Sequence, residues 1–242
     1  DTQRIYGCDG VNPAFEFDGT VFVKIRTGMT TDTPINIAVH KKQLFLAFRG
    51  SSQNSGIGTP YVWSVVLGAA EIALGDSITG YAVLPKALCI FSRDSTNQLT
   101  GSSVADYVLD PLSEKSGAIA GTVQVMGAAY GLDDQGIRQI AATQDFGNFE
   151  NNVVSELIQS LIDDMQAKVV ASSVYRARNQ YRLYGNDGSG IIMATKNDKI
   201  IGFTQFQYPV NVTCTCSAEN SNGEDVVFFG ADNGYVYQAD KG

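Results

Sequence analysis

Short apolar stretches separated by turn residues recur along the chain, and this pattern predicts an all-β protein. Near the end, residues 226–229 form an apolar run of the kind found in buried strands. Residues 232–234 (Asp-Asn-Gly) follow with turn-forming chemistry, and residues 235–237 are aromatic or β-branched, as returning strands often are. Residues 181–193 have the same layout, and residues 61–66 read as a further strand. The pattern therefore indicates a repeated strand–turn–strand unit.

The spacing of these units is typical of propeller blades. Their apolar anchors are Tyr6, Leu44, Leu88, Ala128, Tyr181 and Val226. Neighbouring anchors are 38 (Tyr6 to Leu44) to 53 (Ala128 to Tyr181) residues apart, and a four-stranded blade takes roughly 40–45 residues. We therefore expect a β-propeller of about six blades in a single domain over residues 1–242. A pair of β-sandwiches or barrels is the alternative. Because the chain starts with Asp1, we keep open that it is a fragment of a longer protein.

Residues 154–165 break the β pattern and predict one amphipathic helix. Apolar residues recur with helical period at Val154, Leu157, Ile158, Leu161, Ile162 and Met165. Asn151 or Asn152 could cap this helix, so we place a helical insertion at residues 152–166, within or between blades. The helix either packs on its own domain or presents Leu157, Ile158 and Leu161 to a neighbouring subunit.

The acidic composition argues against a protein that wraps nucleic acid. The net charge is −8 and the isoelectric point about 4.6, which disfavours a basic binding patch but allows a passage through which DNA moves. One basic stretch stands out. If residues 175–182 formed a strand, Arg176, Arg178 and Arg182 would share one face. That face could meet phosphate or an acidic neighbour, or the arginines could pair with this chain's own carboxylates.

The residue types that usually form catalytic or metal sites are few in this chain, and their spacing does not match known sites of either kind. The four cysteines, Cys8, Cys89, Cys214 and Cys216, show no CxxC spacing, so we expect buried free thiols and assembly in the cytoplasm. The lone His40 stands at a strand end, where a surface or hydrogen-bonded role is expected. Asp133-Asp134 and Asp163-Asp164 suit turns and solvated faces better than acid–base pairs. We predict no catalytic residue, metal site, cofactor or membrane contact.

Several stretches, taken in order, carry a resemblance to a known family. They are residues 7–19 (GCDGVNPAFEFDG), 68–80 (GAAEIALGDSITG), 130–137 (YGLDDQGI), 146–149 (FGNF), 176–183 (RARNQYRL) and 228–237 (FFGADNGYVY). Together they resemble β-propeller virion proteins of tailed bacteriophages, of the tail nozzle or hub kind. The closing stretch is also similar to the repeat of quinoprotein propellers. Because Trp63 is the one tryptophan of the chain, the docking tryptophans of those blades are missing and no quinone cofactor is expected.

The phage resemblance implies a structural protein rather than an enzyme. It implies a homo-oligomeric ring in the virion tail, assembled in the host cytoplasm, that lines or closes the channel for genome ejection. Other tail or connector proteins would be its partners, with transient passage of DNA, and an acidic wall would repel DNA phosphates. The alternatives are a receptor- or glycan-binding propeller and, in third place, a propeller polysaccharide lyase or glycosidase.

Overall fold

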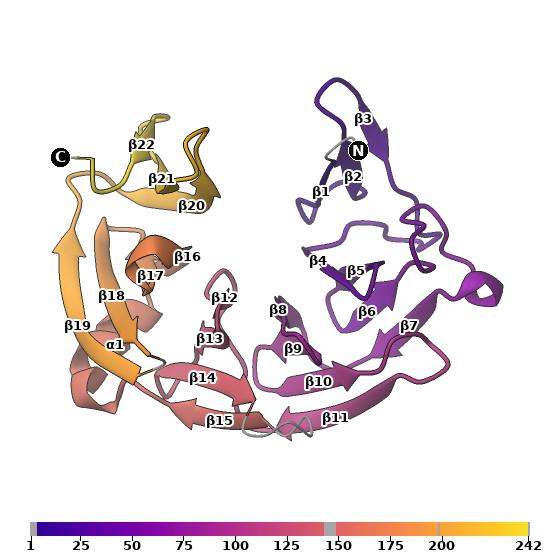
Figure 1. Ribbon diagram of the computed structural model, residues 1–242, viewed down its shortest axis with the longest axis horizontal. Helices are drawn as coiled ribbons and strands as arrows, with labels where there is room; N and C mark the ends of the chain where they lie inside the picture. Colours follow the sequence, from indigo (N-terminus) through magenta and orange to yellow (C-terminus); the bar gives the residue numbers. More distant parts are fainter. Residues whose placement is uncertain (1–3, 143–148, 198, 242) are drawn as a thin grey trace. The chain divides into compact units, whose positions relative to one another are not determined.

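The computed structural model describes residues 4–142, 149–197 and 199–241 and divides into two compact units, Asp1–Lys115 and Ser116–Gly242 (Figure 1). We call them the N-terminal unit and the C-terminal unit. Each contains three antiparallel sheets, in which every strand pairs with the next strand along the chain. This meandering order follows from the short turns between apolar runs, since tight turns join antiparallel neighbours.

The N-terminal unit holds the first eleven strands. Its first sheet comprises β1 (Ile5–Gly7), β2 (Phe15–Phe17) and β3 (Phe22–Lys24). The second comprises β4 (Asn36–His40), β5 (Gln43–Phe48), β6 (Ser51–Asn54) and β7 (Ala70–Ala73), with the 3-10 turn η1 (Val65–Leu67) between β6 and β7. The third comprises β8 (Ile78–Val83), β9 (Leu88–Ser92), β10 (Thr96–Thr100) and β11 (Val108–Ser113).

The C-terminal unit repeats the arrangement. Its sheets are β12 (Gln124–Met126), β13 (Ala128–Leu132), β14 (Ile137–Ala142) and β15 (Phe149–Val153); then β16 (Val169–Tyr175), β17 (Gln180–Gly185), β18 (Ser189–Lys196) and β19 (Lys199–Gln207); and finally β20 (Val212–Glu219), β21 (Asp225–Ala231) and β22 (Val236–Gln238). The 3-10 turn η2 (Glu156–Ile158) and the helix α1 (Gln159–Gln166) connect β15 to β16, and the 3-10 turn η3 (Arg176–Arg178) connects β16 to β17.

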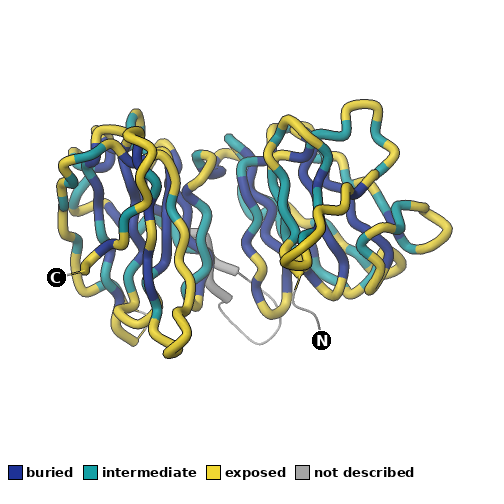
Figure 2. Tube along the Cα trace, turned by 90° about the horizontal axis from the view of Figure 1, so that it is seen from above, coloured by how far each residue is buried: buried dark blue, intermediate teal, exposed yellow. Residues whose placement is uncertain are grey.

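Each of the six predicted anchors lies in a different sheet, so the predicted number of repeats is confirmed. The anchors fall on β1, β5, β9, β13, β17 and β21. The reason is visible in β9, which lies inside its sheet and is buried at all five residues. Figure 2 shows that the centres of many strands are buried (dark blue), whereas the connections between strands are largely exposed (yellow). A strand covered on both faces needs a continuous apolar run, and such a run is readable in sequence.

The hairpin between β21 and β22 also forms where the sequence predicts it. Gly234 has a φ of 83°, and its N–H donates to the carbonyl of Ala231 at 3.1 Å. A side chain at this φ would be strained, so the turn depends on glycine.

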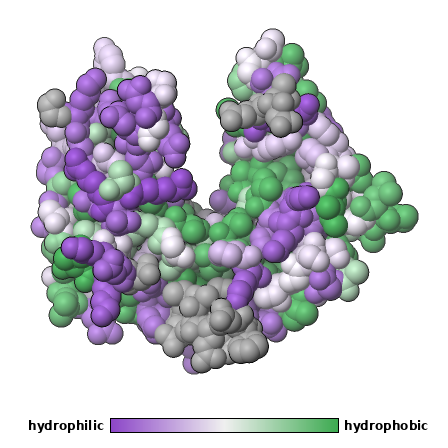
Figure 3. Space-filling view, in the orientation of Figure 1, coloured by the Kyte–Doolittle hydropathy of each residue, from purple (hydrophilic) through white to green (hydrophobic). Residues whose placement is uncertain are grey.

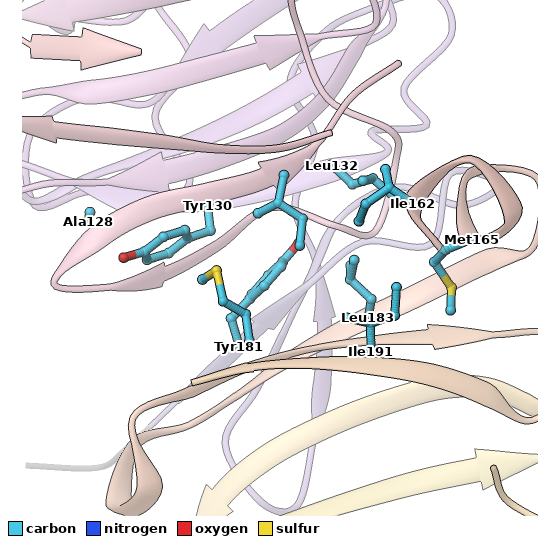
Figure 4. Packing of buried hydrophobic residues seen from close by; sticks show 10 residues of the cluster. Ala128, Tyr130, Leu132, Ile162, Met165, Tyr181, Leu183 and Ile191 are labelled. Atoms are coloured by element: carbon cyan, nitrogen blue, oxygen red, sulfur yellow. The ribbon is translucent and has the colours of Figure 1, made fainter. Parts of the chain in front are cut away.

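Neighbouring sheets within a unit pack through apolar clusters. In the C-terminal unit one cluster joins the sheet of β13, the sheet of β17 and helix α1 (Figure 4). Tyr130 and Tyr181 stack there with ring centroids 5.8 Å apart. The hydroxyl of the buried Tyr181 donates to the carbonyl of Thr122 at 2.6 Å, so this ring fills the core without leaving its polar end unsatisfied.

The predicted helix is present but shorter than residues 152–166. Asn151 and Asn152 belong to β15, where they pair with Ile140 and Gln139 of β14, so neither caps the helix. The hydrogen-bonded ladder of β14 and β15 overrides the helical periodicity at these positions, and α1 begins at Gln159. Of the motifs named above, residues 146–148 lie outside the described residues.

Candidate interaction site

The basic stretch does not form the single strand that would align its arginines. Strand β16 ends at Tyr175, η3 follows, and Asn179 takes a left-handed φ of 50° before β17 begins. The N–H of Asn179 donates to the carbonyl of Arg176 at 3.0 Å and closes the turn. The predicted common face of Arg176, Arg178 and Arg182 is therefore wrong, because a tight turn separates the first two from the third.

Two of these arginines pair with a carboxylate of this chain. Arg182 is 1% exposed, and its Nη2 lies 2.6 Å from Oδ2 of Asp240. Arg178 reaches the same oxygen at 3.3 Å. Both guanidinium groups also lie over the ring of Tyr175, about 5 Å from its centroid. Arg182 and Arg178 therefore fasten the turn after β22 onto the sheet of β17, as the salt-bridge alternative expects.

Arg176 behaves differently from its two neighbours. Its side chain is exposed, and within the part of the chain that the structure describes it makes no ion pair. It borders a cavity of 550 Å³ in the C-terminal unit.

The three apolar candidates near the helix have unequal surroundings. Leu157 on η2 is 96% exposed, whereas Ile158 and Leu161 are partly buried against the cluster of Figure 4. The fully covered side chains of α1 are Ile162 and Met165. The reading in which the helix packs on its own unit is thus correct for its inner face, and Leu157 remains available for a partner.

A second cavity, of 320 Å³, lies between α1 and the strands β18 and β19. Leu161 and Met165 form its helical side, and Gly190 and Phe206 form its sheet side. A Cβ atom at Gly190 would lie 2.0 Å from the ring of Phe206, so glycine allows this ring to lie flat across β18. The cavity extends the partly apolar surface around Leu161.

A further apolar surface was missed by the sequence reading. Residues 61–66, expected as a strand, instead lead into η1, and Gly68 ends this turn with a φ of 88°. Val65, Val66 and Leu67 are 76%, 91% and 62% exposed. Figure 3 shows green atoms protruding where the coil of η1 lies in Figure 1. The sequence contained one signal of this surface, the run Val-Val-Leu directly before a glycine. Such a run is also typical of a strand, and only the structure shows that it pairs with no other strand among the described residues.

His40 and two of the four cysteines are placed differently from expectation. His40 is buried at the end of β4, and burial, with a smaller contribution from Lys41, lowers its pKa to about 4. Burial raises the pKa of Cys89 to about 12 and that of Cys8 to about 11. Cys214 and Cys216 are exposed on β20, so the expectation of buried thiols is wrong for these two, although all four cysteines are free.

The carboxylates singled out in the sequence lie in a turn and on the exposed face of a helix. Asp133 is buried, and its Oδ1 accepts the backbone N–H groups of Gln135 and Gly136 at 2.8 and 2.9 Å. It also pairs with Arg138. Asp163, on α1, accepts a hydrogen bond from Gln159. Over residues 4–142, 149–197 and 199–241, no group of three or more His, Cys, Asp or Glu side chains is arranged to hold a metal ion. The described part also contains no helix of the length and apolarity needed to span a bilayer.

Comparison with known proteins identifies the fold. No protein-family model and no curated protein sequence matches the chain. Among solved structures, the WD40 β-propeller domain of Doa1 aligns with 99% of this chain and 80% of its own, at 10% identity and a TM-score of 0.58. The β-propeller domain of Cps50 (Swd1) from Myceliophteria thermophila aligns with 100% of this chain and 80% of its own, at 11% identity and a TM-score of 0.63. The fold is a six-bladed β-propeller.

A third similar structure is the extracellular domain of the putative one-component system BT4673 from B. thetaiotaomicron. It shares 12% identity and a TM-score of 0.62, and this chain spans 31% of its length. In all, 696 solved chains match, so the propeller is too widespread for the fold alone to indicate a function.

Proposed function

We propose that the chain is a non-enzymatic structural protein of a bacteriophage tail, a ring-forming nozzle or hub subunit that lines or closes the channel for genome ejection. The ordered motifs that resemble such proteins support the assignment to a virion. The observation that carries a structural role is the exposed apolar turn at residues 65–67. An assembly subunit must present apolar surface that a partner covers, and this turn presents three consecutive aliphatic side chains.

The energetic case rests on what covering this turn would contribute. Burying a Val or Leu side chain stabilises by about 1.5–3 kcal/mol. Val65, Val66 and Leu67 are all more than half exposed, and none of the residues of η1 is buried against its own unit. We propose a second copy of this chain as the partner that covers the turn, since a ring requires one contact repeated between identical subunits.

The acidic charge fits a passage for DNA. With a net charge of −8, the chain repels phosphate at low salt rather than binding it. A ring of such subunits would let a genome slide through without holding it. Tight binding of duplex DNA at low salt would contradict this part of the proposal.

The test is the mass of the purified chain by light scattering together with a low-resolution image. We expect a ring with an axial hole, which dissociates into monomers when Val66 is replaced by Asp. Val11 provides the matched control, because it is 75% exposed in an unrelated turn and Val11→Asp makes the same change there. Monomers in the unmodified chain, or equal masses for the two variants, would contradict the proposal.

A receptor- or glycan-binding propeller is the second candidate, and one observation favours it. Tyr235 is 69% exposed at the β21–β22 hairpin, beside Tyr237 and Asn233. The side-chain amide of Asn233 donates to the hydroxyl of Tyr237 at 2.9 Å, which combines an aromatic face with oriented polar groups. Aromatic rings of this kind can stack on sugars. Specific glycan binding by the monomer that is lost in Tyr235→Ala would favour this candidate over the ring.

A further inference from the structure

The cavity beside Arg176 has the composition of a binding site. It has a volume of 550 Å³ and lies entirely within the C-terminal unit, between the β12–β13 turn and the turns that follow β16 and β18. Its size falls within the range of about 300–1,000 Å³ of small-molecule sites. Arg176, Asn179 and Asn197 supply its polar side, and Val125 and Met126 supply an apolar wall.

The polar side chains at this cavity are not used by the protein itself. The two other arginines of the same stretch, Arg178 and Arg182, share the carboxylate of Asp240. Arg176 has no such partner among the described residues, and the side-chain amides of Asn179 and Asn197 likewise make no hydrogen bond there. Arg176 shares the lack of an ion pair with Arg26 and Arg49 among the described residues, but it differs from them in bordering this cavity beside two amides without partners. Its five N–H donors are free for a ligand.

The backbone that carries Arg176 is held in place. Asp225 accepts the N–H of Ala177 at 3.0 Å, and the carbonyl of Arg176 accepts the N–H of Asn179 at 3.0 Å. The carbonyl of Asn179 in turn accepts both the N–H and the hydroxyl of Thr195, at 2.9 and 3.3 Å. These bonds connect the two turns of the cavity. The backbone around the cavity is therefore fixed, so binding would have to order only the side chains that contact the ligand.

We propose that this cavity binds a carboxylate of an acidic peptide segment. One guanidinium group matches one carboxylate, because its planar fork donates two parallel hydrogen bonds. The amides of Asn179 and Asn197 each offer a donor and an acceptor, as the peptide groups beside an acidic residue require. Val125 and Met126 can cover the neighbouring apolar side chain. A phosphate carries up to two negative charges and would find a single cation there, whereas one carboxylate is matched by one guanidinium group.

This site is independent of ring formation, since it lies within one unit of one subunit. The probe is an acetylated and amidated Leu-Glu-Leu peptide, titrated into isotope-labelled protein and followed by NMR. We expect shifts of the Arg176 Nε–H signal and of the side-chain amide signals of Asn179 and Asn197. The Leu-Gln-Leu peptide should bind at least about tenfold more weakly, because it lacks the charge that strengthens the hydrogen bonds.

Matched variants identify the group that binds. Arg176→Gln should abolish the shifts of the Asn179 and Asn197 side-chain amide signals. Arg178→Gln makes the same charge change in the same turn, at a side chain directed to Asp240, and should leave these shifts unchanged. Asn179 and Asn197 have left-handed φ values of 50° and 51°, which glycine adopts freely, so Asn179→Gly and Asn197→Gly remove each amide without strain and should weaken binding several-fold. Equal binding by the two arginine variants, equal binding of the two peptides, or tighter binding of inorganic phosphate would overturn the proposal.

Discussion

The N-terminal and C-terminal units bury polar groups in different ways. Among the described residues, the buried side-chain atoms without a hydrogen-bond partner are Glu16 Oε2, His40 Nε2, Asn54 Oδ1, Ser92 Oγ and Gln98 Oε1, and all of them belong to the N-terminal unit. In the C-terminal unit the buried Arg182, Tyr181 and Tyr184 are each bonded. An unsatisfied buried polar atom costs stability, so we expect the N-terminal unit to be the weaker one.

The two units also differ in how they treat an apolar insertion. In the C-terminal unit, α1 is long enough to have an inner face, and it buries Ile162 and Met165. In the N-terminal unit, η1 is a single 3-10 turn that buries none of its residues. Three residues make one full turn of a 3-10 helix, so their side chains point in different directions and cannot all face the sheet. Helix α1 therefore covers part of its apolar surface within its own unit, whereas η1 leaves all three of its apolar side chains exposed.

The largest expected effect comes from breaking the ion pair between the buried Arg182 and the partly exposed Asp240 in the C-terminal unit. Asp240→Ala leaves the charge of Arg182 buried without its partner and should lower the free energy of unfolding by about 3–4 kcal/mol. Denaturant unfolding measures it. Arg178→Ala is the control, because this exposed arginine contributes less than about 1 kcal/mol to the same cluster. Similar losses in the two variants would show that the burial of Arg182 is not what matters.

The next effect tests the inner face of α1. Ile162→Ala removes a fully buried side chain and should cost about 2–3 kcal/mol. Leu157→Ala, five residues earlier and 96% exposed, should change the free energy of unfolding by less than about 0.5 kcal/mol. Thermal and denaturant unfolding of the pair check the contrast, and a large loss in Leu157→Ala would mean that Leu157 is covered in the folded protein.

A pH titration tests the N-terminal unit. The ordinary pKa of His40 is 6.5, and burial lowers it to about 4, so between these values the unfolded chain binds a proton that the folded chain does not. The stability contribution is therefore complete above pH 6.5 and is lost as the pH falls toward 4. We expect a loss of about 1–2 kcal/mol between pH 7 and pH 5. His40→Gln should flatten this part of the profile, and an unchanged slope would exclude His40 as its source.

The smallest effect compares two buried serines. Ser92, fully buried in the N-terminal unit, has a hydroxyl without a partner, so Ser92→Ala should leave the free energy of unfolding unchanged or raise it by up to about 1 kcal/mol. Ser173 is equally buried in the C-terminal unit and shares a 3.1 Å hydrogen bond with Tyr184. Ser173→Ala should therefore cost about 1 kcal/mol. Equal changes in the two variants would contradict the proposed difference in how the two units satisfy buried polar groups.

The repeat and the turns could be predicted because their signals are local. The apolar run around Leu88 predicts a central strand, and Gly234 predicts a turn because glycine readily adopts a positive φ. The helix was found from its period, but its start was placed too early because the pairing of Asn152 with Gln139 is a contact between strands. The candidate site was predicted less well, since the roles of Arg178 and Arg182 depend on Asp240, about sixty residues away.

The fold class, the number of repeats and the inserted helix can be predicted from the chain alone, because they follow from spacing and local backbone preference. Which residues are free to act depends on contacts between distant segments. Arg182 and Arg176 have the same side chain and lie six residues apart, yet one is buried against a carboxylate and the other faces a cavity. Cys214 and Cys216 are exposed for a similar reason, because no described element covers their face of β20. Segments far away in the sequence decide whether a side chain is buried or paired, so the local sequence pattern does not predict it.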